Sequence, residues 1–144
     1  MSKILAYEHV GIRVTNPDVA VRFYKMLGFR KVLDLPEHHA NEMTNDAGVT
    51  INLIFNGVKR EENRNILLDE PVKWPGVTHP AFIVDDLDAL LTMLQHEGVR
   101  ITEGPHMIGE RRRAFFIRDP DGNVLEFDEL LPGSHAPTSA KETA

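Results

Sequence analysis

Two histidines, each at the start of a short alternating segment, are the residues of this chain best suited to chemistry. His9 begins the segment HVGIRV, and His79 begins HPAFIV 70 residues later. Glu126 lies in a third alternating segment, between Leu125 and Phe127. Two imidazoles and one carboxylate offer the nitrogen and oxygen donors that bind divalent metal ions. These residue types predict a metal site, provided that the fold brings the three side chains together.

An internal duplication relates the two histidines. Residues 9–30 align with residues 79–100 without a gap, and five of the 22 positions are identical. The identical pairs are His9 and His79, Val14 and Val84, Asp18 and Asp88, Gly28 and Gly98, and Arg30 and Arg100. Because these residues occupy the turning points of one shared pattern, we interpret the two segments as copies of one structural unit.

The later parts of the two copies also match, with a shifted offset. Residues 46–55 and 119–130 each contain an Asp/Gly turn followed by a segment typical of a strand. Alignment of the two turns sets Asn52 on Glu126. If the copies pack about a pseudo-twofold axis, these two positions and the two histidines form the corners of one site.

Each copy is predicted to contain a strand, a helix and a further strand. Residues 10–14 alternate between apolar and polar, as in a strand with one buried face. Asn16 is predicted to cap the helix that follows, Pro17 to occupy its first position and Gly28 to end it. Asp86 caps the corresponding helix of the second copy. The apolar helix stripes, which predict core packing, are Ala20, Phe23, Tyr24 and Leu27, and Leu87, Leu90, Leu91 and Leu94.

The same alternation predicts the face on which each candidate ligand lies. The apolar strand residues are expected to face the helices, so His9 and His79 should face away from them. Glu126 and Asn52 stand between apolar neighbours and should also face away from the helices. All four side chains are therefore expected on the face of the strands that the helices leave open.

The composition narrows the classes of function. The chain has 144 residues, 42% of them hydrophobic, which suffices for one domain with its own core. Sixteen basic and 22 acidic residues give a net charge of −6, which argues against nucleic acid or an anionic membrane as partner. The lack of cysteine excludes a catalytic thiol, Cys-ligated zinc and disulfides. No segment has the apolar length of a signal peptide or a membrane span, so we expect a cytoplasmic protein.

The predicted organisation is a single domain over residues 1–131. Module one covers residues 5–56 and module two residues 77–130, and a polar connection over residues 57–76 joins them. Residues 132–144 are rich in Ser, Thr, Ala and Pro and have no periodicity. We expect this tail to be disordered.

Three segments of the chain resemble the vicinal oxygen chelate superfamily, which includes glyoxalase I, extradiol dioxygenases, methylmalonyl-CoA epimerase, and fosfomycin- and bleomycin-resistance proteins. They are EHVGIRVTNPDVAVRFYKMLGF, THPAFIVDDLDALLTML and IRDPDGNVLEF, and the resemblance covers about residues 5–130. The DPDGN turn followed by a carboxylate is the most specific of these motifs. The resemblance implies an α+β fold in which two βαβββ modules form a cupped mixed β-sheet, with helices on the convex face and a metal in the cup.

Position by position, the resemblance implies metal ligands at His9, His79 and Glu126. The fourth corner, which is Glu in glyoxalase I and commonly Gln in the epimerase, falls on Asn52. Asn is neutral and short, so it would ligate only weakly and could not take a proton from carbon. Glu126 is then the one carboxylate of this set available as a catalytic base.

The ligand set favours one reaction class and leaves others open. Two His and one carboxylate with open positions are typical of non-haem iron and oxygen chemistry, so the favoured function resembles extradiol dioxygenation of a small substrate bound through vicinal oxygens. Fe²⁺ or Mn²⁺ is favoured, and Zn²⁺ or Ni²⁺ is the alternative. Fosfomycin-resistance enzymes use the same set, usually with Mn²⁺, so a lyase, isomerase or transferase of the glyoxalase or fosfomycin type stays open. A metal-free binding protein of the bleomycin-resistance kind is the third alternative.

Further residues are candidates for contact with a substrate. Arg13 shares the predicted face of His9 and, with Asn52, is a candidate substrate-binding residue; the run 111–113 of three arginines is a weaker candidate for an anion. The candidate acid and base groups of an extradiol reaction are Tyr7, His38 and His39. Relatives often dimerise, so we predict a homodimer and leave open whether one site draws on one chain or two.

Overall fold

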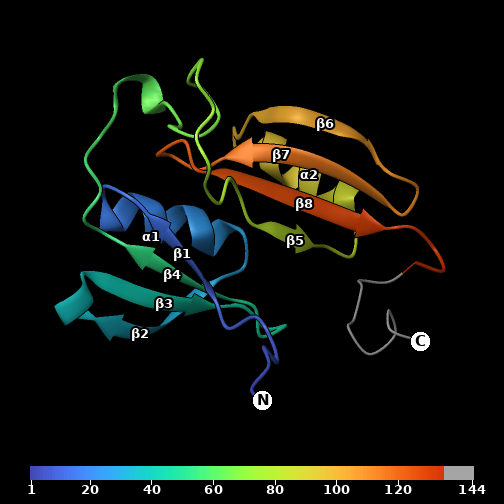
Figure 1. Cartoon of the computed structure of the whole chain (residues 1–144). Coiled ribbons are helices and arrows are strands. Elements are labelled where there is room, and N and C mark those ends of the chain that lie inside the picture. Colours follow the sequence, from blue (N-terminus) through green and yellow to red (C-terminus); the bar gives the residue numbers. More distant parts are fainter. Residues whose placement is uncertain (135–144) are drawn as a thin grey trace. The chain divides into compact units, whose positions relative to one another are not determined.

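The computed structural model describes residues 1–134, which divide into two compact units. Unit 1 comprises residues 1–69 and 119–123, and unit 2 comprises the other described residues. Within the described residues, each unit contains a four-stranded mixed sheet and one α-helix (Figure 1). The α+β class and the two βαβββ modules are confirmed.

Unit 1 builds its sheet around a parallel pair of strands. Its elements are β1 (Val10–Arg13), α1 (Pro17–Met26), β2 (Arg30–Leu35), the 3₁₀ turn η1 (Pro36–His38), β3 (Ala40–Thr44), β4 (Thr50–Ile54) and the 3₁₀ turn η2 (Glu61–Asn63). The strand order is β1-β4-β3-β2, in which β1 and β4 are parallel and the other pairs antiparallel. Strand β2 is therefore an edge strand.

Unit 2 repeats this topology. Its elements are β5 (Ala81–Ile83), α2 (Leu87–His96), β6 (Ile101–Ile108), β7 (Arg112–Arg118) and β8 (Val124–Leu130). The strand order is β5-β8-β7-β6, again with one parallel pair, β5 and β8. Strands β4 and β8 thus occupy equivalent places beside the first strand of each unit.

Both helices begin and end where the sequence predicts. The Oδ1 atoms of Asn16 and Asp86 each accept a hydrogen bond, of 3.1 Å and 3.0 Å, from the backbone N–H three residues further on. Gly28 and Gly98 follow the helices with φ angles of +98° and +78°, the left-handed conformation that a residue without a Cβ adopts most easily. These local signals position each helix against its sheet.

The cores lie between each helix and one face of its sheet. In unit 1 the buried residues of this layer are Ile12, Val14, Ala20, Tyr24, Met43, Ile51 and Leu53. In unit 2 they are Leu87, Leu94, Phe115, Ile117, Leu125 and Phe127. Because strand side chains alternate between faces, the residues between these apolar positions lie on the opposite face of each sheet.

The DPDGN turn belongs to unit 1. The Tyr24 hydroxyl donates to Asp119 Oδ2 at 2.8 Å, and the Thr15 hydroxyl donates to Asp121 Oδ1 at 2.7 Å. Burial raises the pKa of both Asp119 and Tyr24 above their ordinary values, although the hydrogen bonds that Asp119 accepts partly offset its shift. The turn is thus a packing element of the first unit.

The boundaries predicted for the connection and the tail differ from those of the two units. The predicted connection, residues 57–76, is divided after Asp69 between unit 1 and unit 2. Of the tail predicted to be disordered, residues 132–144, the first three include a turn in which Ser134 N donates to Leu131 O, and residues 135–144 lie outside the described residues. No helix within residues 1–134 is long and apolar enough to cross a bilayer.

Candidate functional site

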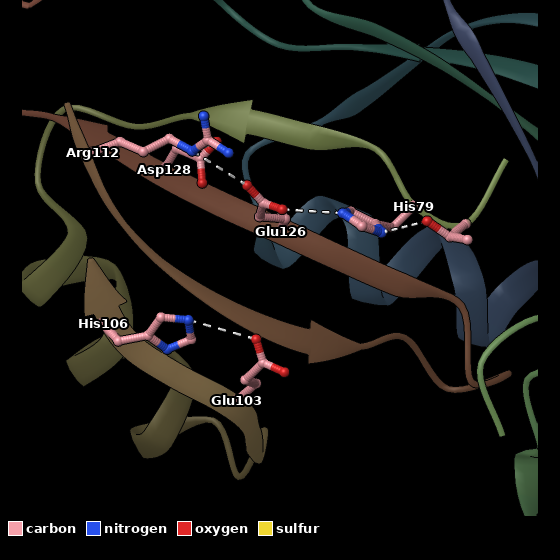
Figure 2. A network of polar contacts seen from close by, with 7 residues as sticks. His79, Glu103, His106, Arg112, Glu126 and Asp128 are labelled. Atoms are coloured by element: carbon pink, nitrogen blue, oxygen red, sulfur yellow. Dashed lines mark hydrogen bonds and ion pairs between the residues drawn. The ribbon is translucent and has the colours of Figure 1, made fainter. Parts of the chain in front are cut away.

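His79 and Glu126 lie side by side on the face of unit 2 that α2 leaves open (Figure 2). His79 Nε2 lies 3.0 Å from Glu126 Oε1, and His79 Nδ1 lies 2.8 Å from the Thr78 hydroxyl. The Phe116 ring contacts the imidazole edge to face, with centroids 5.4 Å apart. The side chain of Glu126 is only 6% exposed and that of His79 is 28% exposed. This imidazole and carboxylate are therefore oriented by packing and reachable from solvent on the histidine side.

Arg112 and Asp128 extend this pair into a polar network, the unit 2 network (Figure 2). The buried Nε of Arg112 lies 3.5 Å from Asp128 Oδ2 and 3.9 Å from Glu126 Oε2. These distances are those of ion pairs rather than hydrogen bonds. Sequence reasoning missed Asp128 and identified Arg112 only as part of the arginine run 111–113, not as a neighbour of Glu126. The available signal for Asp128 was its position two residues after Glu126, because alternate residues of a strand share a face.

Burial and a neighbouring charge of the unit 2 network raise the pKa of Asp128. This pKa is raised to about 7: burial is the largest cause, the hydrogen bond and the negative charge of Glu126 also raise it, and Arg112 lowers it. Two adjacent carboxylates on a largely buried face cannot both ionise without mutual repulsion. A proton is therefore held at Asp128 up to near neutral pH.

His9, immediately before β1, and Asn52, on the neighbouring strand β4, lie in unit 1. Asn52 on β4 pairs with Gly11 of β1 and, on its other side, with Glu42 of β3. The Oδ1 atom of Asn52 is buried and has no hydrogen-bond partner among the described residues. His9 is 38% exposed at its side chain, and its Nδ1 lies 2.8 Å from Glu8 Oε1. Glu42, beside Asn52, is a carboxylate that sequence reasoning did not identify.

The strand registers place Asn52 and Glu126 at equivalent positions. Asn52 pairs with the residue two places after His9, and Glu126 pairs with the residue two places after His79. The turns before these strands match too, with a glycine of positive φ in each. The alignment of the two copies is thus confirmed by strand pairing.

The other candidates have contacts of their own or are exposed. Arg13 Nε donates to Asn56 Oδ1 at 2.9 Å, and Arg113 contacts Asp88 at 3.1 Å. Tyr7 is 84% exposed, in the segment before β1. His38 and His39, the other candidate acid and base groups, are also exposed.

The donor types fit a divalent metal, but the described residues hold no complete ligand cluster. Among residues 1–134, no group of three or more His, Cys, Asp or Glu side chains is arranged to hold a metal ion. His79 and Glu126 supply one nitrogen and one oxygen at adjacent positions, and a metal would compete with the contact that now joins them. Unit 2 therefore presents two of the three ligands predicted from the sequence, and the third, His9, lies in unit 1.

Residues 6–127 match the model of the Glyoxalase/Bleomycin resistance protein/Dioxygenase superfamily. The chain belongs to this superfamily. It is the vicinal oxygen chelate superfamily that the three sequence segments resemble, so that prediction is confirmed. Each of the two units has the βαβββ order that the resemblance implies.

The chain is also similar to individual proteins and solved structures. The metallothiol transferase FosB of Shouchella clausii (strain KSM-K16) is 31% identical over 121 residues, which cover 82% of this chain and 75% of that protein. A structure from the mobile metagenome of V. pseudocholerae is 26% identical with a TM-score of 0.66, covering 94% of this chain and 99% of that one. TnmS3, an antibiotic binding protein from Streptomyces sp. CB03234, is 24% identical with a TM-score of 0.67, covering 91% and 100%. The last similarity concerns the fold alone.

Proposed function

We propose that the chain is a divalent-metal-dependent enzyme that binds two neighbouring oxygens of a small substrate, with His9, His79 and Glu126 as metal ligands. The observation that carries this proposal is the 3.0 Å contact between His79 Nε2 and Glu126 Oε1. It holds an imidazole and a carboxylate together at the positions where superfamily resemblance puts two ligands. His9 enters as the duplicate of His79.

The residues around the ligands have roles that follow from their contacts. The Thr78 hydroxyl, 2.8 Å from His79 Nδ1, fixes the ring orientation and leaves Nε2 as the ligating atom. Phe116 limits rotation of the same ring. Arg112 offsets the negative charge of Glu126 and Asp128. A bound divalent metal would polarise the substrate oxygens.

Thiol transfer is the reaction class that we propose first. The 31% identical relative is named a metallothiol transferase. This chain contains no cysteine, so the thiol would have to come from a second small substrate. The thiol sulfur would form a bond to an electrophilic carbon of the other substrate while a carbon–oxygen bond of that carbon breaks, and the released oxygen would take up the thiol proton.

Extradiol dioxygenation, which the sequence alone favoured, is the second candidate. The ligand set of two His and one carboxylate supports it, because this set leaves positions open for a diol and for oxygen. The two candidates differ in metal and co-substrate. Mn²⁺ with a thiol belongs to the first, and Fe²⁺ with oxygen belongs to the second.

Metal content tests the ligand assignment. We expect the protein purified without chelator, or reconstituted with Mn²⁺, Fe²⁺, Zn²⁺ or Ni²⁺, to hold about one metal per chain. His79→Ala should lose it. The matched control is His106→Ala, since His106 also faces a carboxylate, Glu103, at 3.6 Å on β6 (Figure 2). Metal content unchanged in His79→Ala would contradict the assignment.

Substrate consumption separates the reaction classes. Thiol loss that requires Mn²⁺ and an electrophilic substrate supports transfer, whereas oxygen uptake with Fe²⁺ and a catechol supports the second candidate. Failure to bind any of the four metals would leave the chain a small-molecule-binding protein. We propose a homodimer as well, which light scattering of the purified protein measures directly.

A further inference from the structure

A cavity of about 450 Å³ lies in unit 1, beside α1 and on the helix side of the sheet. This face is opposite to the one that carries Asn52, because the cavity residue Asn41 pairs with the buried core residue Leu53. The volume is within the range of roughly 300 to 1,000 Å³ that is usual for small-molecule sites. Its charged and polar lining residues are Asp18, Arg22, Lys25, Lys31, Asp34 and Asn41.

The cavity exists because the edge of the sheet presents polar residues toward the helix. In the strand register, Lys31 pairs with Met43 and Asp34 pairs with Asn41, so these side chains share the helix side. Val32, an apolar residue of the same strand, is about half exposed rather than packed in the core. A sheet face covered by a helix is normally apolar, and departures from that pattern are concentrated at functional sites.

Asn41 is the least expected of these residues. Only 1% of it is exposed, and its Oδ1 atom has no hydrogen-bond partner among the described residues. Its cross-strand neighbour, Asp34, offers only acceptor oxygens when ionised. A buried carbonyl oxygen without a donor is destabilising. The cavity therefore contains an acceptor that a ligand with an N–H group would satisfy.

The helix side of the cavity carries charges without partners. Asp18, Arg22 and Lys25 are spaced by four and three residues, which puts them on one side of α1. No hydrogen bond or ion pair joins these three side chains to another of the described residues 1–134. By contrast, Lys31 and Asp34 pair with each other at 3.1 Å. Two cations and one carboxylate are thus available to a ligand.

We propose that this cavity binds an α-amino acid with an apolar side chain. The carboxylate of the ligand binds Arg22 and Lys25, and its ammonium group donates to Asn41 Oδ1 while Asp18 balances its charge. The apolar side chain lies against Phe55, which also lines the cavity. The site is separate from the proposed metal ligands and does not depend on them.

Titration of the isotope-labelled protein with L-leucine, followed by amide NMR, tests the proposal. We expect saturable shifts confined to residues 17–25, 31–34, 41 and 55, and no change in metal content. Two analogues each lack one charged group: 4-methylpentanoate lacks the amine and 3-methylbutylamine lacks the carboxylate. Each should bind at least about tenfold more weakly, because one charge-assisted contact is lost.

Two variants and one control connect the shifts to the cavity. Asn41→Leu removes the acceptor while keeping a similar volume, and Arg22→Gln removes one cation from an exposed position; both should weaken leucine binding at least about tenfold. Arg30→Gln, which removes a cation paired with Asp46 outside the cavity, should not. The proposal is wrong if leucine gives no saturable shifts, or if Arg22→Gln and Asn41→Leu bind it as the unmodified protein does.

Discussion

At the scale of single residues, the two carboxylates Glu126 and Asp128 define the character of the candidate site. They lie on one face of β8 with the guanidinium of Arg112 beside them. The pKa of Asp128 is raised to about 7 by burial first and by Glu126 second. The network is therefore sensitive to pH in a range where ordinary carboxylates no longer titrate.

This shift predicts how stability depends on pH. An acid whose pKa is higher in the folded state binds more protons folded than unfolded. The stabilisation that protonated Asp128 contributes is therefore complete below its ordinary pKa of 3.8 and is lost as the pH rises through about 7. In the presence of a chelator, the unfolding free energy should fall more steeply between these pH values for the unmodified protein than for Asp128→Asn. Urea denaturation across the range measures this. Asp46→Asn, at a fully exposed side chain, is the control, and equal slopes for Asp128→Asn and the unmodified protein would refute the prediction.

The residues found from the sequence are those whose face follows from local alternation. His79 and Glu126 each follow this rule, and the structure brings them into contact. Arg112 could not be found in this way, because its place beside Glu126 depends on the register of β7 against β8. Asn41 was missed because it is a polar residue on the helix side of β3, opposite Asp34 of β2, where alternation predicts an apolar residue.

At the scale of elements, the two Asp/Gly turns are alike in backbone and different in surroundings. Gly48 and Gly122 have φ angles of +82° and +85°, and each donates its N–H to the residue three places before it. A Cβ at Gly48 would meet open space, whereas one at Gly122 would collide with the backbone oxygen of Asn63. The equivalent turns thus tolerate a side chain to different degrees.

Alanine at these two glycines should therefore have unequal effects. Gly48→Ala should reduce the unfolding free energy by about 1 to 2 kcal/mol, the cost of the left-handed conformation. Gly122→Ala should lose roughly a further 1 to 3 kcal/mol, because the chain around Asn63 must move. Urea denaturation of both variants under one set of conditions gives the comparison. Equal losses would mean that the turn at Gly122 is not packed as the structure describes.

Helices were more predictable than strands, for physical reasons. Capping depends on a few neighbouring residues, so Asn16 and Asp86 were identified correctly. Strands β2 and β6 are mostly exposed and contain register shifts, and they have no clear apolar alternation. Their presence followed only from resemblance to the superfamily.

At the scale of the whole molecule, the compact units do not follow the boundaries of the duplication. Residues 119–123 lie in the second copy of the sequence but belong to unit 1. The sequence contained no sign of this, because the contacts that hold the turn, such as the one from Tyr24 to Asp119, join residues 95 apart. Unit 1 is therefore completed by a segment that the chain supplies only after most of unit 2.

This arrangement predicts that residues 1–69 do not fold on their own. Without the turn, the buried hydroxyl of Tyr24 and the hydroxyl of Thr15 lose their acceptors, and a fragment of this length has little core to compensate. Thermal melting followed by circular dichroism should show no cooperative transition for the fragment. The same fragment carrying residues 118–124 on a flexible Gly/Ser linker should regain one, since the linker restores the turn at high effective concentration. A fragment 1–69 that melts cooperatively at the temperature of the whole chain would show that the turn is dispensable to unit 1.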